Sequence, residues 1–285
     1  MANRSTADSR GTSPLEAAGP VTLEMQSAQV RRRLFGACLT IELLLLLADA
    51  LINWGRLIDI GPIRRLFNIA REDGLASWFM ASQTLLAGLT LWLVVLVVRA
   101  RGESRGRVWG WAFLALFFTG MAVDDGALIH ERVGSAFKAV VLPGEGDQAA
   151  LTWGGRLLEI FPSYPWQLLF LPLLAAAGLF LLVFLWRQLS RKGARSALLL
   201  ALGCLALAVG LDFVEGMSEA HPWNLHAWMT EQGGFSPAAV RHFSKAIEEF
   251  LEMLGISVFW ALFADQLMRL ARGGLLLIFR HGSQG

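Results

Sequence analysis

The chain carries carboxylates inside segments that are otherwise strongly apolar. Asp124 and Asp125 lie near the end of one such segment, and His130 and Glu131 follow them closely. An ionised group at the middle of a membrane span costs about 2.5–3.5 kcal/mol on insertion scales, so proteins that keep several such groups generally use them. The pattern therefore predicts a functional site built from acidic side chains.

Helical spacing places most of these acids on shared faces, because residues three, four or seven apart lie on one side of an α-helix. The same-face groups are Glu42 with Asp49, Asp124 with Glu131, Asp212 with Glu215, and Glu249 with Glu252. Asp125 and His130 do not share the face of Asp124 in a regular helix. They contact different neighbours, or a local irregularity of the helix turns His130 back toward Asp124.

Carboxylates at this density cannot all ionise in a low dielectric, so protons or cations must neutralise some of them. Two of the helices also direct their negative C-terminal ends at the group, which favours a cation. Carboxylates with a histidine suit Fe, Mn or Zn, and we therefore predict a divalent-metal site. The predicted ligands are Asp124, His130, Glu131, Glu215, Glu249 and Glu252. The predicted supporting residues are Glu42, Asp49, Glu72, Asp125, Asp212 and Glu248.

A plainer interpretation applies to some of these acids. Carboxylates near helix ends can simply be hydrated, or can pair with Arg132, Arg241 or Lys245. Glu42 can act as a polar contact between helices. The convergence of several separate segments at one depth favours a site over these alternatives.

The composition predicts an all-α, polytopic membrane bundle. Hydrophobic residues make up 55% of the 285 residues, charged residues 17%, and the mean hydropathy is +0.50. Six apolar runs are long enough to cross a bilayer as helices. They lie near residues 34–54, 75–98, 108–130, 166–186, 196–216 and 248–270. The net charge of +2 is too balanced to indicate nucleic-acid binding, so the lipid bilayer is the expected partner.

The distribution of basic residues predicts the orientation. Sixteen Lys and Arg fall in the terminal segments and the loops after the second and fourth runs, against nine on the other side. The positive-inside rule then places both termini in the cytoplasm and the acids in the outer half. We expect a disordered tail over 1–33, a transmembrane domain over 34–272 and a second tail over 273–285. The first run is expected to act as a signal anchor.

The segments between the runs carry weaker signals. Residues 55–74 have the pattern of a short amphipathic helix, and residues 131–165 and 217–247 are expected to be loops rich in Gly and Pro. Ser236 followed by Pro237 is typical of an N-cap and first helical position, so the last helix should begin well before its apolar part.

Three patterns carry a resemblance to a known family. They are Glu72 through Trp78-Phe79, Asp124-Asp125 with His130-Glu131, and Glu248-Glu249-x-x-Glu252-x-x-Gly255. Together they resemble a group of uncharacterised bacterial multi-pass membrane proteins, which implies a bacterial inner-membrane location. The resemblance implies no activity, but it implies that the acids and the histidine of these patterns belong together. The second acid of the Asp-Asp pair is usually Glu in that group, whereas here it is Asp125.

Three functions fit these features. A membrane-embedded metalloprotein could use metal-activated water or oxygen on a lipid or hydrophobic ligand, with a free carboxylate as base. A proton or cation carrier or channel could use Glu42 as a relay. A non-catalytic assembly or sensor protein could use the acids to bind a partner. We prefer the first to a carrier or channel because a path for protons or cations would need acids toward the cytoplasm, and beyond Glu42 only Asp265 lies on that side. Whether the protein is an enzyme stays open.

Overall fold

The computed structural model describes residues 26–141, 153–219 and 221–271, and all regular structure within these ranges is helical. The helices are α1 (Ser27–Ala48), continued by the π-helix η1 (Asp49–Trp54), α2 (Gly61–Phe67), α3 (Leu75–Ala100), α4 (Arg105–Ala127), α5 (Ile129–Val141), α6 (Trp153–Ile160), α7 (Pro165–Gln188), α8 (Lys192–Glu215), α9 (Leu225–Glu231) and α10 (Pro237–Leu270).

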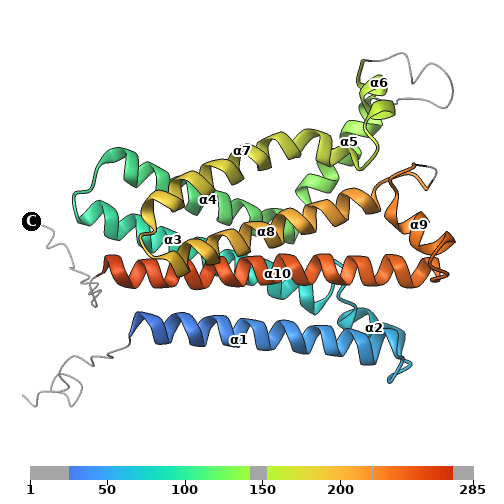
Figure 1. Ribbon diagram of the computed structural model, residues 1–285, viewed down its shortest axis with the longest axis horizontal. Coiled ribbons are helices and arrows are strands. Elements are labelled where there is room, and N and C mark those ends of the chain that lie inside the picture. Colours follow the sequence, from blue (N-terminus) through green and yellow to red (C-terminus); the bar gives the residue numbers. More distant parts are fainter. Residues whose placement is uncertain (1–25, 142–152, 220, 272–285) are drawn as a thin grey trace, which may run out of the picture.

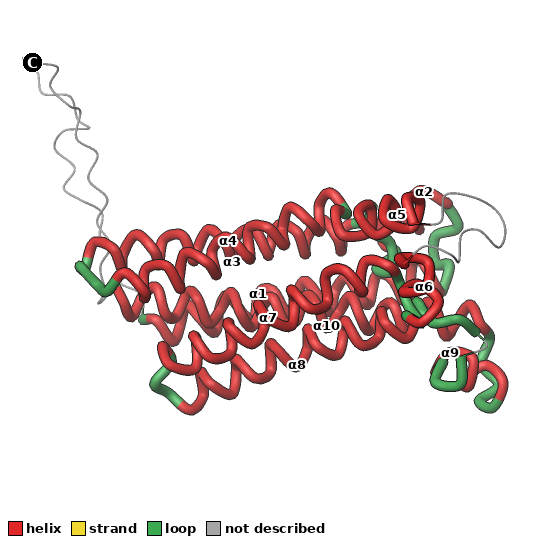
Figure 2. Tube along the Cα trace, turned by 90° about the horizontal axis from the view of Figure 1, so that it is seen from above, coloured by secondary structure: helices red, strands yellow, loops and turns green. Residues whose placement is uncertain are grey.

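The six long helices run side by side along the length of the molecule (Figure 1). The last helix, α10, is central, because it packs against α8, α3 and α1, while α3 and α4 form a tight antiparallel pair. The short helices α2, α5, α6 and α9 gather at one end, which we call the polar end (Figures 1 and 2). The α3–α4 and α7–α8 turns lie at the opposite end.

Five helical segments are long and apolar enough to cross a membrane: 27–54, α3, α4, α7 and α8. Their outward faces are rich in exposed leucines, such as Leu43, Leu44 and Leu47 of α1. Such surfaces are unfavourable in water but suit contact with lipid. The helix α10 is not among the five; it carries three glutamates just before its apolar half and is largely buried by its neighbours.

The apolar core lies away from the polar end and contains a group of packed aromatic rings. Phe118 of α4 makes edge-to-face contacts with Phe259 and Phe263 of α10, at centroid distances of 5.3 and 5.0 Å. All three side chains are fully buried. Such pairs add about 0.5–1.5 kcal/mol each beyond the area they bury, so they fix α10 firmly against α4.

A cluster of charged side chains lies at the opposite end of the bundle. Asp265 of α10 accepts hydrogen bonds of 2.8 Å from Arg191 and Arg269, and Arg31 of α1 lies 3.9 Å away. Since Arg191 precedes α8, this one carboxylate ties together the ends of three helices.

Two expectations about the elements were wrong. The third run does not continue as one helix to residue 130, because Leu128 adopts a left-handed conformation (φ 52°) that ends α4 and starts α5. The ranges 131–165 and 217–247 are not simply loops, since α5, α6 and α9 lie there. Their short amphipathic helices were obscured by the glycines and prolines between them.

The helix starts are closer to expectation. The helix α10 begins at Pro237, and the Ser236 side chain caps it by accepting a 3.2 Å hydrogen bond from the backbone N–H of Ala239. The amphipathic helix expected within 55–74 is α2, which is shorter. The first helix begins at Ser27, before the expected end of the N-terminal tail; residues 1–25 and 273–285 lie outside the described residues.

Candidate functional site

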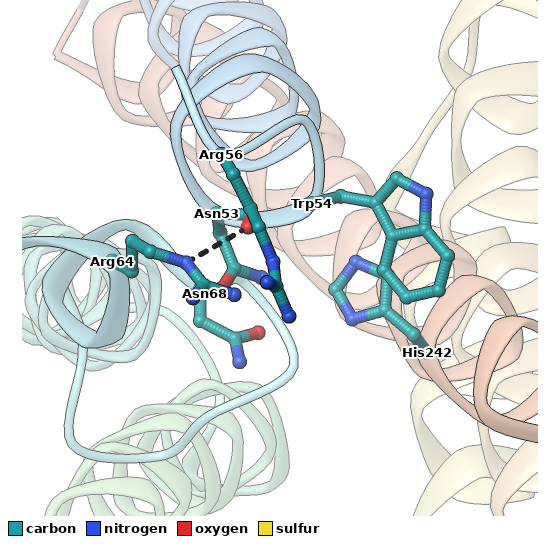
Figure 3. Close-up of a pocket in the computed structure, with 6 residues that line it drawn as sticks. All are labelled: Asn53, Trp54, Arg56, Arg64, Asn68 and His242. Carbon is teal, nitrogen blue, oxygen red and sulfur yellow. Dashed lines mark hydrogen bonds between the residues drawn. The ribbon is translucent and has the colours of Figure 1, made fainter. Parts of the chain in front are cut away.

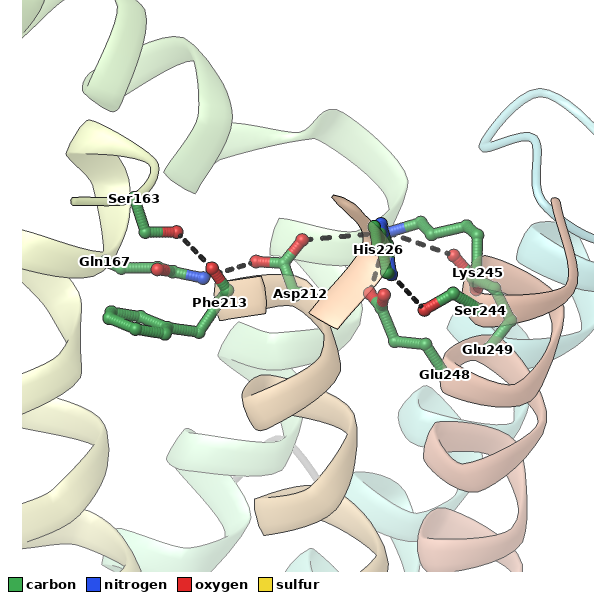
Figure 4. A network of polar contacts seen from close by, with 9 residues as sticks. All are labelled: Ser163, Gln167, Asp212, Phe213, His226, Ser244, Lys245, Glu248 and Glu249. Carbon is green, nitrogen blue, oxygen red and sulfur yellow. Dashed lines mark hydrogen bonds and ion pairs between the residues drawn. The ribbon is translucent and has the colours of Figure 1, made fainter. Parts of the chain in front are cut away.

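Lys245 of α10 stands at the centre of the acidic side chains (Figure 4). Its Nζ lies 2.7 Å from Glu248 Oε1, 3.6 Å from Glu249 Oε1 and 3.9 Å from Asp212 Oδ1. Two of these acids lie one turn away on the same helix, and the third comes from α8. One lysine therefore partly neutralises three largely buried carboxylates, which we take as the centre of the acid cluster.

The α8 side of the cluster is held by α7. Gln167, whose side chain is fully buried, donates a 2.7 Å hydrogen bond to Asp212 Oδ2. Ser163, just before α7, donates to the backbone carbonyl of Phe213 at 2.8 Å (Figure 4). The Asp212 carboxylate is thus fixed between a neutral donor and Lys245.

Asp124 and His130 form a compact pair at the junction of α4 and α5. Asp124 Oδ2 lies 2.7 Å from His130 Nδ1, and Asp124 Oδ1 accepts a 2.8 Å hydrogen bond from the His130 backbone N–H. The left-handed Leu128 brings these groups together, and Asp124 thereby caps the first turn of α5. Burial alone would lower the pKa of His130, but the hydrogen bond and charge of Asp124 outweigh burial and raise it.

Glu72 and Glu131 approach each other from the α2–α3 loop and from α5. The two carboxyl groups are close enough to influence each other's ionisation. Burial of its carboxyl and then this contact with Glu131 raise the pKa of Glu72 to about 7, while Lys245 opposes the shift. Part of the Glu72 side chain remains exposed, so solvent can reach this pair.

The remaining acids extend the cluster toward the core. Asp125 of α4 lies within electrostatic range of Glu249 and Glu252 of α10. Glu215 ends α8. One carboxylate oxygen of Glu215 and one of Glu248 are buried without a hydrogen-bond partner among the described residues. An ionised oxygen in that position pays a desolvation penalty that a proton removes.

Glu42 occupies a separate position, deeper in the bundle. Its side chain is fully buried, and its Oε1 accepts hydrogen bonds from Ser257 Oγ of α10 at 2.5 Å and from Gln83 Nε2 of α3 at 3.2 Å. Gln83 and Ser257 are also in contact with each other. The second oxygen of Glu42 has no partner among the described residues. These three polar groups link α1, α3 and α10.

Asp49, seven residues further along α1, is also separate from the acid cluster. Its Oδ2 lies 2.9 Å from His242 Nε2, and its Oδ1 accepts hydrogen bonds from Asn53 Nδ2 at 2.9 Å and from the backbone N–H of Ile69 at 3.2 Å. Glu42 and Asp49 both face α10, as their spacing predicts, but they contact different groups.

With this geometry in place, comparison with known proteins gives one match. Residues 37–267 match the model of a family described as a domain of unknown function, DUF8692. The chain belongs to this family. No curated protein and no solved structure matches it. The family match covers every residue of the acid cluster, together with Glu42 and Asp49, so the whole site lies inside the family's domain.

The structure brings together most of the acids that the sequence grouped. Around Lys245 and His130 lie acids from α4, α5, α8, α10 and the loop before α3. The cluster contains Glu72, Asp124, Asp125, Glu131, Asp212, Glu215, Glu248, Glu249 and Glu252. Glu42 and Asp49 lie outside it. Within the described ranges, however, no group of three or more His, Cys, Asp or Glu side chains is arranged to hold a metal ion.

Sequence reasoning missed the neutral partners in this DUF8692 domain. Gln83, Ser257 and Gln167 lie in apolar helices, and each contacts a buried carboxylate. Polar residues inside an apolar span are the signal that could have identified them. Lys245 was considered merely as a surface partner, although its position one turn before Glu248 and Glu249 places it among the acids.

Proposed function

We propose that the protein crosses the membrane six times, with α10 as the sixth span and both termini in the cytoplasm. Five apolar helical segments support the membrane location, and the apolar part of α10, near residues 248–270, is long enough to be the sixth span. The excess of Lys and Arg at the end opposite the acid cluster supports the orientation. The polar end then faces the outside, across the inner membrane of a bacterium.

We propose further that the acid cluster binds protons and makes the protein respond to pH on that side. The cluster holds nine carboxylates, and Lys245 and His130 are the cations that pair with them among the described residues. Like charges this close in a partly dry environment cannot all ionise. The contacts of Lys245 carry the proposal, because this one cation faces the carboxylates of Asp212, Glu248 and Glu249. Glu215 and Glu248 each also keep a buried carboxylate oxygen that has no hydrogen-bond partner among the described residues.

Access to the cluster supports exchange from one side. Glu72 is partly exposed at the polar end, so protons can enter there. Toward the opposite end, α10 presents Phe259 and Phe263, which are packed against Phe118, between Ser257 and Asp265. A continuous polar path therefore ends at the level of Glu42 and Ser257. This favours a protonation-dependent switch or sensor over continuous proton flow.

Metal binding by the cluster stays a prediction. It was predicted because the acids need a cation among them, and Lys245 meets part of that need. The lipid or hydrophobic ligand expected with a metalloenzyme likewise stays a prediction.

An infrared pH titration of the full chain in detergent tests the proposal. Protonated carboxyl groups absorb separately from carboxylates, so the parent should show a carboxyl signal that titrates near pH 7, as expected for Glu72 beside Glu131, Glu249 and Lys245. Glu72→Gln should remove that signal. Glu231→Gln, at an exposed acid of α9, is the matched control and should leave it unchanged.

Two results would overturn the proton-binding proposal. One is a parent protein in which no carboxyl signal titrates around neutral pH. The other is stoichiometric Fe, Mn or Zn in protein purified without chelators, lost on Asp124→Ala and Glu252→Ala, which would establish the metal site instead.

A further inference from the structure

A cavity of about 490 Å³ lies at the polar end, on the α1 side of α10 and apart from the acid cluster (Figure 3). It is lined by Asn53, Trp54, Arg56, Arg64, Asn68 and His242. This volume falls in the range of small-ligand sites. Its lining contains two guanidinium groups and two amides but no carboxylate, in contrast to the neighbouring cluster.

The π-helix at the end of α1 shapes one wall. The extra residue per turn is visible in the hydrogen bond from Gly55 N–H to the carbonyl of Ala50, five residues earlier, at 2.9 Å. A β-carbon at Gly55 would lie 2.9 Å from that same oxygen, so the turn requires glycine. Short π-helical segments occur frequently at functional sites. Here the turn places Asn53, Trp54 and Arg56 around the same opening.

Asp49 holds two of the side chains that line the cavity, those of Asn53 and His242. It is buried and holds His242 of α10, Asn53 of η1 and the backbone of Ile69 through three hydrogen bonds. The indole of Trp54 stacks on the His242 ring, with a centroid distance of 4.8 Å and an interplanar angle of 9°. The cavity is therefore bounded by side chains whose positions are set by a buried network.

Three side chains of the cavity offer hydrogen-bond donors, namely Arg56, Arg64 and Asn68. Arg56 forms no ion pair or hydrogen bond within the described part of the chain, and its backbone is in the left-handed region (φ 53°). Strain of this kind at a non-glycine residue is characteristic of functional sites. Arg64 donates from Nε to the carbonyl of Asn53 at 3.1 Å, which leaves its terminal amino groups available (Figure 3). Asn68 Oδ1 accepts from Ala70 N–H, so its Nδ2 is free to donate.

One carboxylate approaches this group of donors from outside. Asp59 lies 3.6 Å from a terminal nitrogen of Arg64, but its side chain is 79% exposed, so the pair is weak and easily exchanged for a ligand. The same segment, between η1 and the end of α2, also carries the exposed apolar side chains of Leu57, Ile60 and Leu66. A segment with this mixture of exposed apolar and basic side chains suits the boundary between lipid headgroups and acyl chains.

We propose that this cavity binds an anionic phosphate group, as presented by the headgroup of an acidic phospholipid or by a soluble phosphate. Two guanidinium groups and an amide N–H₂ match several phosphate oxygens, and paired Arg donors are the preferred protein partners of phosphate. Trp54 in the lining and the exposed apolar side chains of the 57–66 segment offer contacts for the acyl chains of a lipid.

Binding to the purified full chain in neutral detergent tests the proposal. The probes are phosphatidylglycerol, phosphatidylcholine and inorganic phosphate, followed by native mass spectrometry and thermal unfolding. Phosphatidylglycerol should bind and stabilise the parent more than phosphatidylcholine does. Arg56→Gln and Arg64→Gln should each weaken this binding about tenfold, as expected for loss of one charge-assisted contact. Arg65→Gln is the matched control, because Arg65 is exposed on α2, next to Arg64, and its substitution removes the same charge.

The outcomes separate the sources of the phosphate. Equal stabilisation by inorganic phosphate, lost in the same two variants, would keep the site and assign it to a soluble anion. Equal effects of Arg56→Gln and Arg65→Gln, or binding of neither phosphatidylglycerol nor inorganic phosphate in preference to phosphatidylcholine, would overturn the proposal. The infrared signal of the Glu72–Glu131 pair should persist in Arg56→Gln and Arg64→Gln, which shows that these variants fold and that the two sites are independent.

Discussion

Replacing Lys245 with methionine is the most direct test of how the acid cluster is stabilised. Methionine fills a similar volume but removes the positive charge that lies 2.7 Å from Glu248 and 3.6 Å from Glu249. At an effective dielectric of about 20, the closer contact is worth about 6 kcal/mol of Coulomb energy and the more distant one about 4–5 kcal/mol. Desolvation of the charges offsets much of this, so removing one partner of a buried pair costs about 3–5 kcal/mol.

The cost should depend on pH in a defined direction. At high pH, Lys245→Met leaves the carboxylates of Glu248, Glu249 and Asp212 without their cation, and the full loss should appear. At low pH these acids can bind protons, which removes the uncompensated charges, so the loss should shrink as the pH falls. A loss of about 3 kcal/mol corresponds to a fall in Tm of roughly 6–12 °C for a chain of this size.

Thermal unfolding of the full chain in detergent, followed by tryptophan fluorescence, measures this effect. Arg241→Met on the same helix is the control, because Arg241 is exposed and should shift Tm little. The double variant Lys245→Met with Glu248→Gln should recover part of the lost stability, since it removes the nearest orphaned charge. A pH-independent loss, or a double variant no more stable than Lys245→Met alone, would refute our account of the cluster.

Two further predictions concern the deep polar contact and the orientation. Glu42→Gln should unfold at the parent's Tm or above, because an amide oxygen can accept the same two hydrogen bonds and no charge is buried, whereas Ser257→Ala should cost about 1–3 kcal/mol by leaving Glu42 and Gln83 without a shared partner. Reporter fusions at Gly285 and within residues 143–150 should report cytoplasmic and external locations respectively; the reverse result would exclude the proposed topology.

Much of the bundle followed from hydropathy, because long apolar runs in a membrane protein have few structures open to them. The expected runs at 75–98, 166–186 and 196–216 lie within two residues of α3, α7 and α8 at each end, except that α8 begins at Lys192. The break at Leu128 was not predicted, since the left-handed position is held by a leucine and the nearby Gly126 lies inside the last turn of α4. A regular helix also separates His130 from Asp124, so their contact needed the irregularity that the spacing had left open.

The acids of the candidate site were easier to find than their partners. Carboxylates in apolar helices are conspicuous, but the groups that satisfy them are ordinary polar residues such as Gln167 and Ser257, whose meaning depends on which helices meet. Helix packing order is not encoded in hydropathy, so the separation of Glu42 and Asp49 from the cluster was not predictable. The basic cavity was missed because the amphipathic pattern of residues 55–74 does not show that Arg56 and Arg64 lie beside Asn53 and His242.

The contact between Glu42 and Ser257 also bears on how the protein is made. The two residues are 215 positions apart, in the first and last long helices. At about 5–20 residues per second, a ribosome needs about 10–40 s to synthesise the intervening chain. During that interval the carboxyl of Glu42 has entered the bilayer without the hydroxyl that later binds it, with Gln83 arriving in between. The nascent bundle must therefore hold an incompletely satisfied helix until the end of translation, and α10 completes it.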